Sequence, residues 1–217
     1  MQRKQFLRAL GALIGAGAIG SVLSACGGGD SPPTLEPVAS QAAASLSAEE
    51  IAGLKFMREE EKLAHDVYAA LYGVWGATVF DNISQSETTH TETILALLEK
   101  YGVADPAAGK APGEFEDPDL QALYDTLVAA GRASLIEGLK VGALIEETDI
   151  RDITEKQQAT DEADILRVYD SLMCGSRNHL RAFNGALLDQ GVTYVPAVIT
   201  QTEWDAIANS TMETCGG

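Results

Sequence analysis

One predicted helical face between residues 80 and 101 carries a carboxylate and an imidazole where a protein core is normally apolar. Steps of three and four residues give the inward series Phe80, Ile83, Glu87, His90, Ile94, Leu97 and Tyr101. Burial of an unpaired carboxylate is costly unless its charge is compensated. Glu87 and His90 lie three residues apart, a spacing at which two side chains on one helix face can share a metal ion. Further ligands must then come from other helices.

Three other predicted helices carry the same kind of interruption in their inward faces. The face of residues 54–71 contains Glu61, that of residues 135–153 contains Glu146 and Asp149, and that of residues 165–186 contains His179. A lone inward Glu or His is more often hydrogen-bonded within a core than bound to metal. Four helices that present such groups at one level favour a metal site over a structural polar network.

The spacing of these residues resembles that of a known superfamily. Glu61-x-x-Ala64-x-x-x-Tyr68, followed by Glu87-x-x-His90, resembles the first half of the ferritin-like di-iron proteins, the group of rubrerythrin and bacterioferritin. The segments MREEEKLAHDVY (57–68) and GSRNHLRAF (175–183) resemble more closely an uncharacterised bacterial and archaeal branch of that superfamily. This branch is a domain family of unknown function, and the resemblance covers roughly residues 47–208.

The second half of the superfamily pattern is incomplete in this chain. The fourth helix of ferritin-like proteins usually repeats Glu-x-x-His, whereas the sequence here is Ser176-Arg177-Asn178-His179. Asp149 resembles the additional acid on the third helix of rubrerythrins and is the candidate to replace the missing carboxylate. Ser176 leaves three alternatives open: an open coordination position for substrate, a mononuclear site, or a centre that has decayed.

The resemblance implies an all-α, ferritin-like four-helix bundle with a dinuclear iron centre that reacts with dioxygen or peroxide. Its expected ligands are Glu61, Glu87, His90, Glu146, Asp149 and His179. Glu87 is the expected bridge and the two histidines are the expected terminal ligands. Oxygen-rich ligation with two imidazoles suits iron or manganese better than zinc or copper. The electron donor and the oligomeric state are not indicated. The alternatives are a metal-binding module without turnover and a structural surface domain with a degenerate site.

Helix-start signals divide the domain, which we expect over residues 47–210. Capping boxes begin at Ser47 and Thr200, Ser134 caps the third core helix, and Asp117-Pro118 opens a short additional helix. The fourth core helix is expected to begin near Thr160. About thirty residues separate the second and third core helices, so a long crossover carries the extra helix, as in ferritin-like proteins. A short C-terminal helix and a flexible tail (211–217) complete the chain.

The N-terminus has the features of a bacterial lipoprotein. A basic start, an apolar run and the lipobox-like Leu23-Ser24-Ala25-Cys26 predict a signal peptide over residues 1–25 and lipidation of Cys26. Residues 26–46 are rich in Gly, Pro, Ser and Ala and predict a disordered tether. We expect attachment to the cell envelope through the lipid, at the outer membrane facing the periplasm if the cell is Gram-negative. The alternative is an uncleaved signal anchor.

The charge of the chain argues against nucleic acid as a partner. The formal net charge is −17, and the leader contributes three positive charges and no acids, so residues 26–217 carry −17 − 3 = −20. Such a surface has no basic stripe to neutralise phosphates. It attracts cations, although solubility explains the same composition. The chain also lacks a Gly-rich phosphate loop, a Cys-x-x-Cys pair and a Ser/His/Asp grouping.

Other polar residues near the expected site have simpler interpretations. We expect Glu59 to be solvated, Glu60 to be a weak second choice as a ligand, and His65 to lie beside the site or on the surface. Tyr68 and Tyr169 face inward near the acids and are expected mainly to fill the core.

Two cysteines remain for a disulfide once Cys26 is lipidated. Cys174 faces away from the predicted metal face, where the segment after the last helix can reach it. In an oxidising compartment we expect Cys174 to pair with Cys215.

Overall fold

The structure is a computed structural model that describes residues 46–215. These residues form six helices and no strand, which confirms the all-α class. The helices are α1 (Ala48–Trp75), α2 (Thr78–Lys100), α3 (Pro118–Gly131), α4 (Leu135–Gln158), α5 (Ala163–Asp189) and α6 (Gln201–Ala208). The expected signal peptide, Cys26 and almost the whole expected tether lie outside the described residues. Within residues 46–215 no helix is both long enough and apolar enough to cross a membrane.

Four of the six helices described begin at a cap expected from the sequence: α1, α3, α4 and α6. Ser47 and Glu50 form a capping box on α1, and Thr200 and Glu203 form one on α6. Asp117 caps α3 with Pro118 at its first position. The fourth core helix, expected to begin near Thr160, begins at Ala163. The Thr160 hydroxyl accepts a hydrogen bond from the backbone N–H of Glu162 and donates to Glu50 Oε1 at 2.6 Å, which ties the α4–α5 loop to α1.

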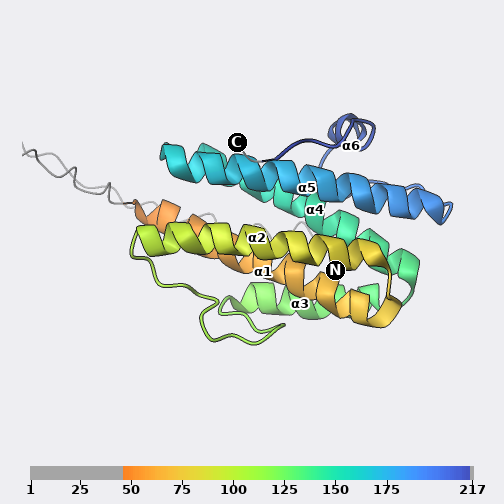
Figure 1. The fold of residues 1–217 in the computed structure, drawn as a ribbon, viewed down its shortest axis with the longest axis horizontal. Coiled ribbons are helices and arrows are strands. Elements are labelled where there is room, and N and C mark those ends of the chain that lie inside the picture. Colours follow the sequence, from red (N-terminus) through yellow and green to blue (C-terminus); the bar gives the residue numbers. More distant parts are fainter. Residues whose placement is uncertain (1–45, 216–217) are drawn as a thin grey trace, which may run out of the picture. The chain divides into compact units, whose positions relative to one another are not determined.

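The four long helices α1, α2, α4 and α5 pack against one another. The principal contacts pair α1 with α2 and α4 with α5, and further contacts join α1 with α4 and α2 with α5 (Figure 1). Helices α2 and α4 run in the same direction, so the connection between them crosses the length of the helices. Helix α3 lies in this connection and packs on α1 and α4, while α6 contacts α5.

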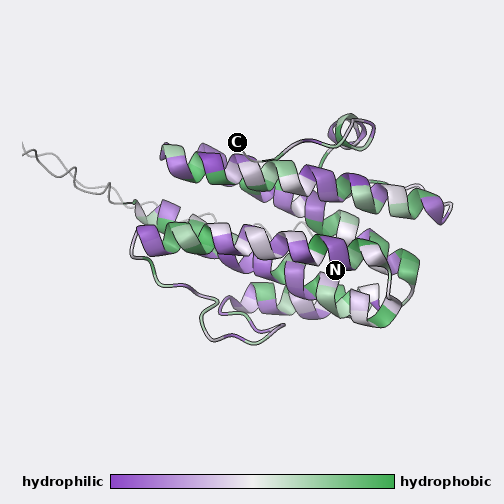
Figure 2. Cartoon of the chain, in the orientation of Figure 1, coloured by the Kyte–Doolittle hydropathy of each residue, from purple (hydrophilic) through white to green (hydrophobic). Residues whose placement is uncertain are grey.

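The core lies between the inward faces of the four long helices. Figure 2 shows apolar and polar residues alternating along each helix, as expected for helices with one buried face. Nearly all of the inward positions expected from the sequence are buried, and only positions at helix ends, such as Leu135 and Ala186, are partly exposed. Aromatic rings fill the core on one side of the polar level: Tyr68 and Phe80 pack against Phe183 with centroids 5.2 and 5.8 Å away.

The segment after α6 is attached to the outer face of α5. Cys174 and Cys215 are joined by a disulfide, with their Cα atoms 5.6 Å apart. The carboxylate of Glu213 pairs with Arg177 at 2.5 Å and with Arg181 at 2.6 Å. Residues 211–215 have no regular secondary structure, and these contacts attach them to α5.

Candidate metal centre

The six residues expected as ligands come from all four long helices. Glu61 lies on α1, Glu87 and His90 lie on α2, Glu146 and Asp149 lie on α4, and His179 lies on α5. Every one of these side chains is buried; the most exposed, His90, retains 8% of its accessible surface. The inward faces of the four helices therefore bring the six residues into one buried region.

Five of the six residues form two overlapping groups. Glu61, Glu87 and His90 make one group, and Glu87, Glu146 and His179 make the other. Within each group, one potential ligand atom from each residue lies within 4.8 Å of the others. Glu87 belongs to both groups, and its two oxygens contact different histidines. Oε2 lies 2.7 Å from His90 Nδ1, and Oε1 lies 2.8 Å from His179 Nδ1. A carboxylate in this position can bridge two cations.

Several of these atoms are close to one another without being hydrogen-bonded. Glu61 Oε1, Glu87 Oε2 and His179 Nδ1 are buried and have no hydrogen-bond partner, although His179 Nδ1 lies near two carboxylates. Buried polar atoms normally find a partner, so these atoms would be satisfied by a cation placed between them. The donor set of carboxylate oxygens and imidazole nitrogens is also the set that iron and manganese accept. The residues present therefore fit a metal centre.

The electrostatics of the metal-free centre show how much charge it concentrates. Burial raises the pKa of Glu61 to about 7, and His90 offsets only part of this effect. Burial also raises the pKa of Glu146 and, with repulsion from Glu61, raises that of Asp149 well above its ordinary value. Burial opposes ionisation of Glu87 too, but His179 and His90 outweigh it and hold the pKa of Glu87 well below its ordinary value.

The two imidazoles respond in the opposite direction. Burial alone would lower their pKa values, but the neighbouring carboxylates outweigh it. Glu61 and Glu87 raise the pKa of His90 well above its ordinary value, and Glu87 and Glu146 raise that of His179 to about 10. Without metal, protons on the imidazoles compensate the acids. A metal ion would take the place of these protons.

Neighbouring residues hold the ligands in position. The buried Tyr68 hydroxyl donates to Glu146 Oε1 at 2.5 Å, so Tyr68 both fills the core and orients a ligand. Ser86 Oγ lies 3.0 Å from His179 Nε2 and fixes the ring with Nδ1 toward Glu87. Gly175 lets α5 approach His90, because a Cβ at this position would lie 2.4 Å from His90 Cε1. Sequence reasoning missed Ser86 and Gly175, since neither falls in a recognisable ligand pattern.

Asp149 lies beside the two groups but belongs to neither of them. It accepts a hydrogen bond from Ser176 Oγ, and its other oxygen, Oδ1, is buried without a partner. The serine at the vacant carboxylate position and the candidate replacement acid are thus in direct contact.

Two acids near the ligands have structural roles that the sequence did not reveal. Glu59 was expected to be solvated, but it is buried and accepts hydrogen bonds from the backbone N–H groups of Glu116 and Asp117. Glu147 is fully buried and accepts from the backbone N–H groups of residues 197–199. Each carboxylate fixes an irregular segment just ahead of a short helix, and neither is available as a ligand. His65 lies at the edge, bonded to Asp66.

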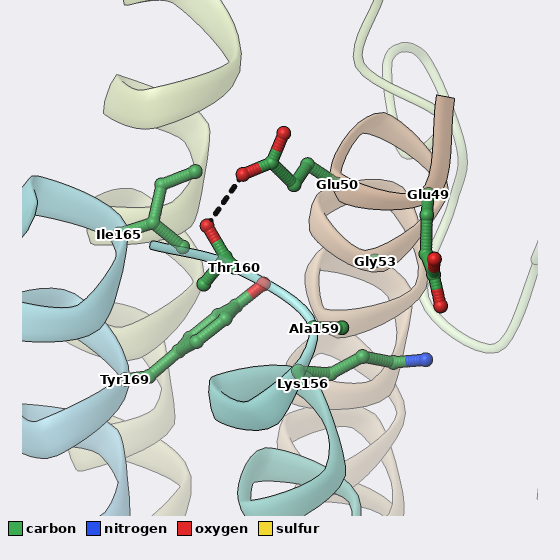
Figure 3. A pocket seen from close by; sticks show the side chains of 8 residues that line it. All are labelled: Glu49, Glu50, Gly53, Lys156, Ala159, Thr160, Ile165 and Tyr169. Atoms are coloured by element: carbon green, nitrogen blue, oxygen red, sulfur yellow. Dashed lines mark hydrogen bonds between the residues drawn. The ribbon is translucent and has the colours of Figure 1, made fainter. Parts of the chain in front are cut away.

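Tyr169 is buried and fills the core, as expected, but it lies away from the candidate metal centre. It lines a small pocket with Glu50, Thr160 and other residues of α1, α4 and α5 (Figure 3). Glu50 precedes Glu61 by eleven residues, which is about 16 Å along a helix. Glu50, Asp161 and Glu162 bring three carboxylates together here. Both oxygens of Glu50 already accept hydrogen bonds, from Ser47 and Thr160, so this group carries no comparable indication of a cation.

Comparison with known proteins identifies relatives of the whole helical region. The family described as an uncharacterized protein domain, DUF2202, matches residues 50–211. The uncharacterized protein MJ0754 of Methanocaldococcus jannaschii is 45% identical over 179 residues, which cover 82% of this chain and 97% of that protein. A crystal structure of hypothetical protein MJ0754 from Methanococcus jannaschii has a TM-score of 0.77 and 44% identity, and the match covers 81% of this chain and 100% of the other. The chain therefore belongs to the DUF2202 family of uncharacterized domains.

Proposed function

We propose that this protein is a lipid-anchored, ferritin-like metalloprotein whose dinuclear iron or manganese centre reacts with dioxygen or peroxide. The observation that carries the proposal is the sharing of Glu87 between two groups of potential ligands, each completed by one more carboxylate and one imidazole. The buried Glu61 Oε1 has no hydrogen-bond partner, and the two oxygens of Glu87 face two different imidazoles, which suits two cations better than one closed hydrogen-bond network.

The helix arrangement supports a ferritin-like four-helix bundle. Helices α1, α2, α4 and α5 pack together, and the connection from α2 to α4 is long and carries α3 (Figure 1). Ferritin-like bundles have one such crossover and place their ligands inward from all four helices. Here the ligands likewise come from all four.

The proposed ligand roles follow from the contacts. Glu87 would be a ligand to both ions, Glu61 and His90 would complete one site, and Glu146 and His179 would complete the other. When bound, two such ions would supply the electrons that reduce dioxygen or peroxide. Tyr68 keeps Glu146 oriented and remains protonated, because burial and the charge of Glu146 raise the pKa of the phenol well above its ordinary value. Ser176 stands at the position of the missing carboxylate and contacts Asp149, which belongs to neither ligand group; we propose that the coordination position left in this way is the one that a small substrate takes.

Peroxide turnover separates the proposed activity from its alternatives. Purified protein loaded anaerobically with ferrous iron should consume hydrogen peroxide in the presence of a chemical reductant. Glu87→Ala should slow this consumption ~10-fold or more, because both groups lose a ligand. Glu92→Gln, which changes an exposed acid on the same helix, should leave it unchanged.

The other outcomes assign the protein to another class. Iron bound without peroxide consumption above that of Glu87→Ala would indicate a metal-binding module without turnover. Failure of the protein to bind metal would indicate a structural domain with a degenerate site.

Membrane attachment is a separate part of the proposal and rests on the lipobox-like sequence before Cys26. Lipid chains on this cysteine would anchor the protein to the cell envelope. A Cys26→Ser variant should lose the anchor and leave the membrane fraction. A variant that stays in the membrane fraction at the size of the parent would refute the lipoprotein assignment.

A further inference from the structure

The disulfide between Cys174 and Cys215 begins on α5 beside the candidate metal centre. Cys174 immediately precedes Gly175, and Gly175 packs so closely on the centre that a Cβ there would lie 2.4 Å from His90 Cε1. Only a few covalent bonds therefore separate Cys174 Sγ from the backbone atoms that pack against the ring of a candidate ligand. This separation is short enough for electrons to pass between the sulfur and a metal ion bound by His90.

The two ends of this crosslink differ in exposure. Cys174 is buried, whereas Cys215 is exposed in the segment that follows α6. An external thiol can therefore reach Cys215 without any rearrangement of the helices. The side-chain amide of Asn178 donates a hydrogen bond to Cys215 Sγ at 3.3 Å, and the same donor would stabilise the thiolate that forms when the disulfide is reduced. The crosslink thus connects the solvent, through α5, with the buried centre.

Contacts other than the crosslink also hold the segment that carries Cys215. Arg177 and Arg181 pair with the carboxylate of Glu213 at 2.5 and 2.6 Å. The side chain of Asn178 bonds the backbone of Glu213 in both directions, donating to the carbonyl at 3.0 Å and accepting from the N–H at 2.9 Å. Reduction of the disulfide would leave these contacts in place, so the two sulfur atoms would stay close and could form the bond again. A crosslink that only attached the segment would duplicate them.

We propose that Cys174 and Cys215 form a redox pair that supplies electrons to the candidate metal centre, and that their disulfide is the oxidised form of this pair. The inference rests on the proposed function and names the class of its reductant, an external dithiol. Hydrogen peroxide takes up two electrons and two protons and becomes two molecules of water. The two thiols release the same two electrons and two protons as their S–S bond forms. Exchange with the external dithiol then breaks that bond, and the reductant leaves as a disulfide.

The rate at which the disulfide forms in reduced protein tests this role. The full-length protein is reduced with a phosphine, loaded anaerobically with ferrous iron and freed of unbound reagents. After addition of one equivalent of hydrogen peroxide, the remaining thiols are alkylated at short intervals, and peptide mass spectrometry counts them at Cys174 and Cys215. The disulfide should form at least ~10-fold faster in the iron-loaded parent than in the iron-free parent or in Glu87→Ala, which lack the assembled centre. Glu92→Gln, the exposed control on α2, should behave like the parent.

The double variant Cys174→Ser, Cys215→Ser separates electron supply from a structural role. It should bind as much iron as the parent. Its consumption of peroxide with dithiothreitol, a dithiol, should fall to the rate measured without protein. Its consumption with ascorbate, which is not a thiol, should stay at the parent rate. A crosslink with a purely structural role would change both rates alike, and that result would overturn the proposal.

Failure of this inference is distinct from failure of the proposed function. If the disulfide forms at the same rate with and without iron, while the parent consumes peroxide with ascorbate, the electron-supplying role is wrong and the proposed function stands. If the iron-loaded parent consumes no peroxide with either reductant, the proposed function fails and this inference fails with it. Should the double variant unfold, the thiol count in the parent decides, because it needs no substitution of either cysteine.

Discussion

Single residues differ in whether they belong to one, both or neither of the two groups of candidate ligands. Glu87 takes part in both ligand groups, whereas Asp149 takes part in neither and contacts Ser176. The consequence of losing a carboxylate should therefore depend on its position more than on its burial, which is nearly the same for the two residues.

We expect Glu87→Ala to remove more metal than Asp149→Ala. Loss of Glu87 takes a ligand from both groups, so iron content should fall to well below half of the parent value. Asp149→Ala should retain most of the iron, because Asp149 belongs to neither ligand group. Elemental analysis of variants reconstituted in parallel measures this difference, and equal losses in the two variants would show that Glu87 has no shared role.

We expect Gly175→Ala to weaken metal binding without removing a ligand. The added methyl group would lie 2.4 Å from His90 Cε1, so the ring must move. Displacing a positioned ligand should lower metal affinity by about 10–100-fold. Gly185→Ala is the matched control on the same helix, since a Cβ there has no atom within 4 Å, and it should stabilise the helix by ~0.5–1 kcal/mol. Isothermal titration of both variants decides the matter; identical affinities would contradict the role given to Gly175.

At the scale of elements, α5 serves two purposes with its two faces. Its inner face carries Ser176 and His179, while its outer face holds the last described residues through Cys174 and the two arginines that clamp Glu213. The C-terminal segment therefore restrains the same turns that position a ligand.

We expect loss of the disulfide to destabilise the fold by about 2–4 kcal/mol, because the crosslink closes a loop in the unfolded chain. The paired variant Cys174→Ser, Cys215→Ser should melt at a lower temperature, while the ion pairs of Glu213 keep the segment attached. Thermal denaturation followed by circular dichroism provides the comparison. Two free thiols in the parent protein from the periplasm, detected by mass spectrometry, would contradict the crosslink.

The elements differ in how far the sequence could predict them. Helix starts were predictable where a capping side chain acts within its own turn, as at Ser47 and Thr200. The bond from the Thr160 hydroxyl to Glu50 could not be predicted, because its partner lies 110 residues away. The same reason explains Glu59 and Glu147, whose partners are backbone groups of distant loops. Helical periodicity places a residue on a face, but it cannot show what the rest of the chain brings to that face.

The ligand set could be proposed from the sequence because four acids and two histidines interrupt otherwise apolar faces. The division into two groups, the exclusion of Asp149 from both, and the close approach of Gly175 to His90 depend on how the helices are rotated and spaced.

At the scale of the whole molecule, the buried charges couple stability to pH. In the metal-free protein the pKa of Glu61 rises from 4.5 to about 7 and that of His179 rises from 6.5 to about 10. Between pH 4.5 and about 7 for Glu61, and between pH 6.5 and about 10 for His179, the folded state binds more protons than the unfolded state. The free energy of unfolding therefore falls as pH rises through these ranges. Glu87 acts in the opposite sense, and its contribution is lost as pH falls below its ordinary value of 4.5.

We therefore expect the metal-free protein to be most stable near pH 5 and to melt at progressively lower temperature toward pH 9. Metal should raise the melting temperature most at the alkaline end, where it replaces the protons that the imidazoles lose. Calorimetry with and without chelator across this range measures the effect. A melting temperature that is flat with pH and indifferent to chelator would instead indicate a neutral hydrogen-bonded network.

The most direct test of the central claim is ferrous iron bound per chain, measured together with the melting temperature after anaerobic reconstitution of the purified protein. We expect about two tightly bound ions per chain, held by the residues around Glu87. The melting temperature should rise with iron concentration. Binding of less than about a tenth of an equivalent, with the same melting temperature in the presence and absence of iron, would contradict it.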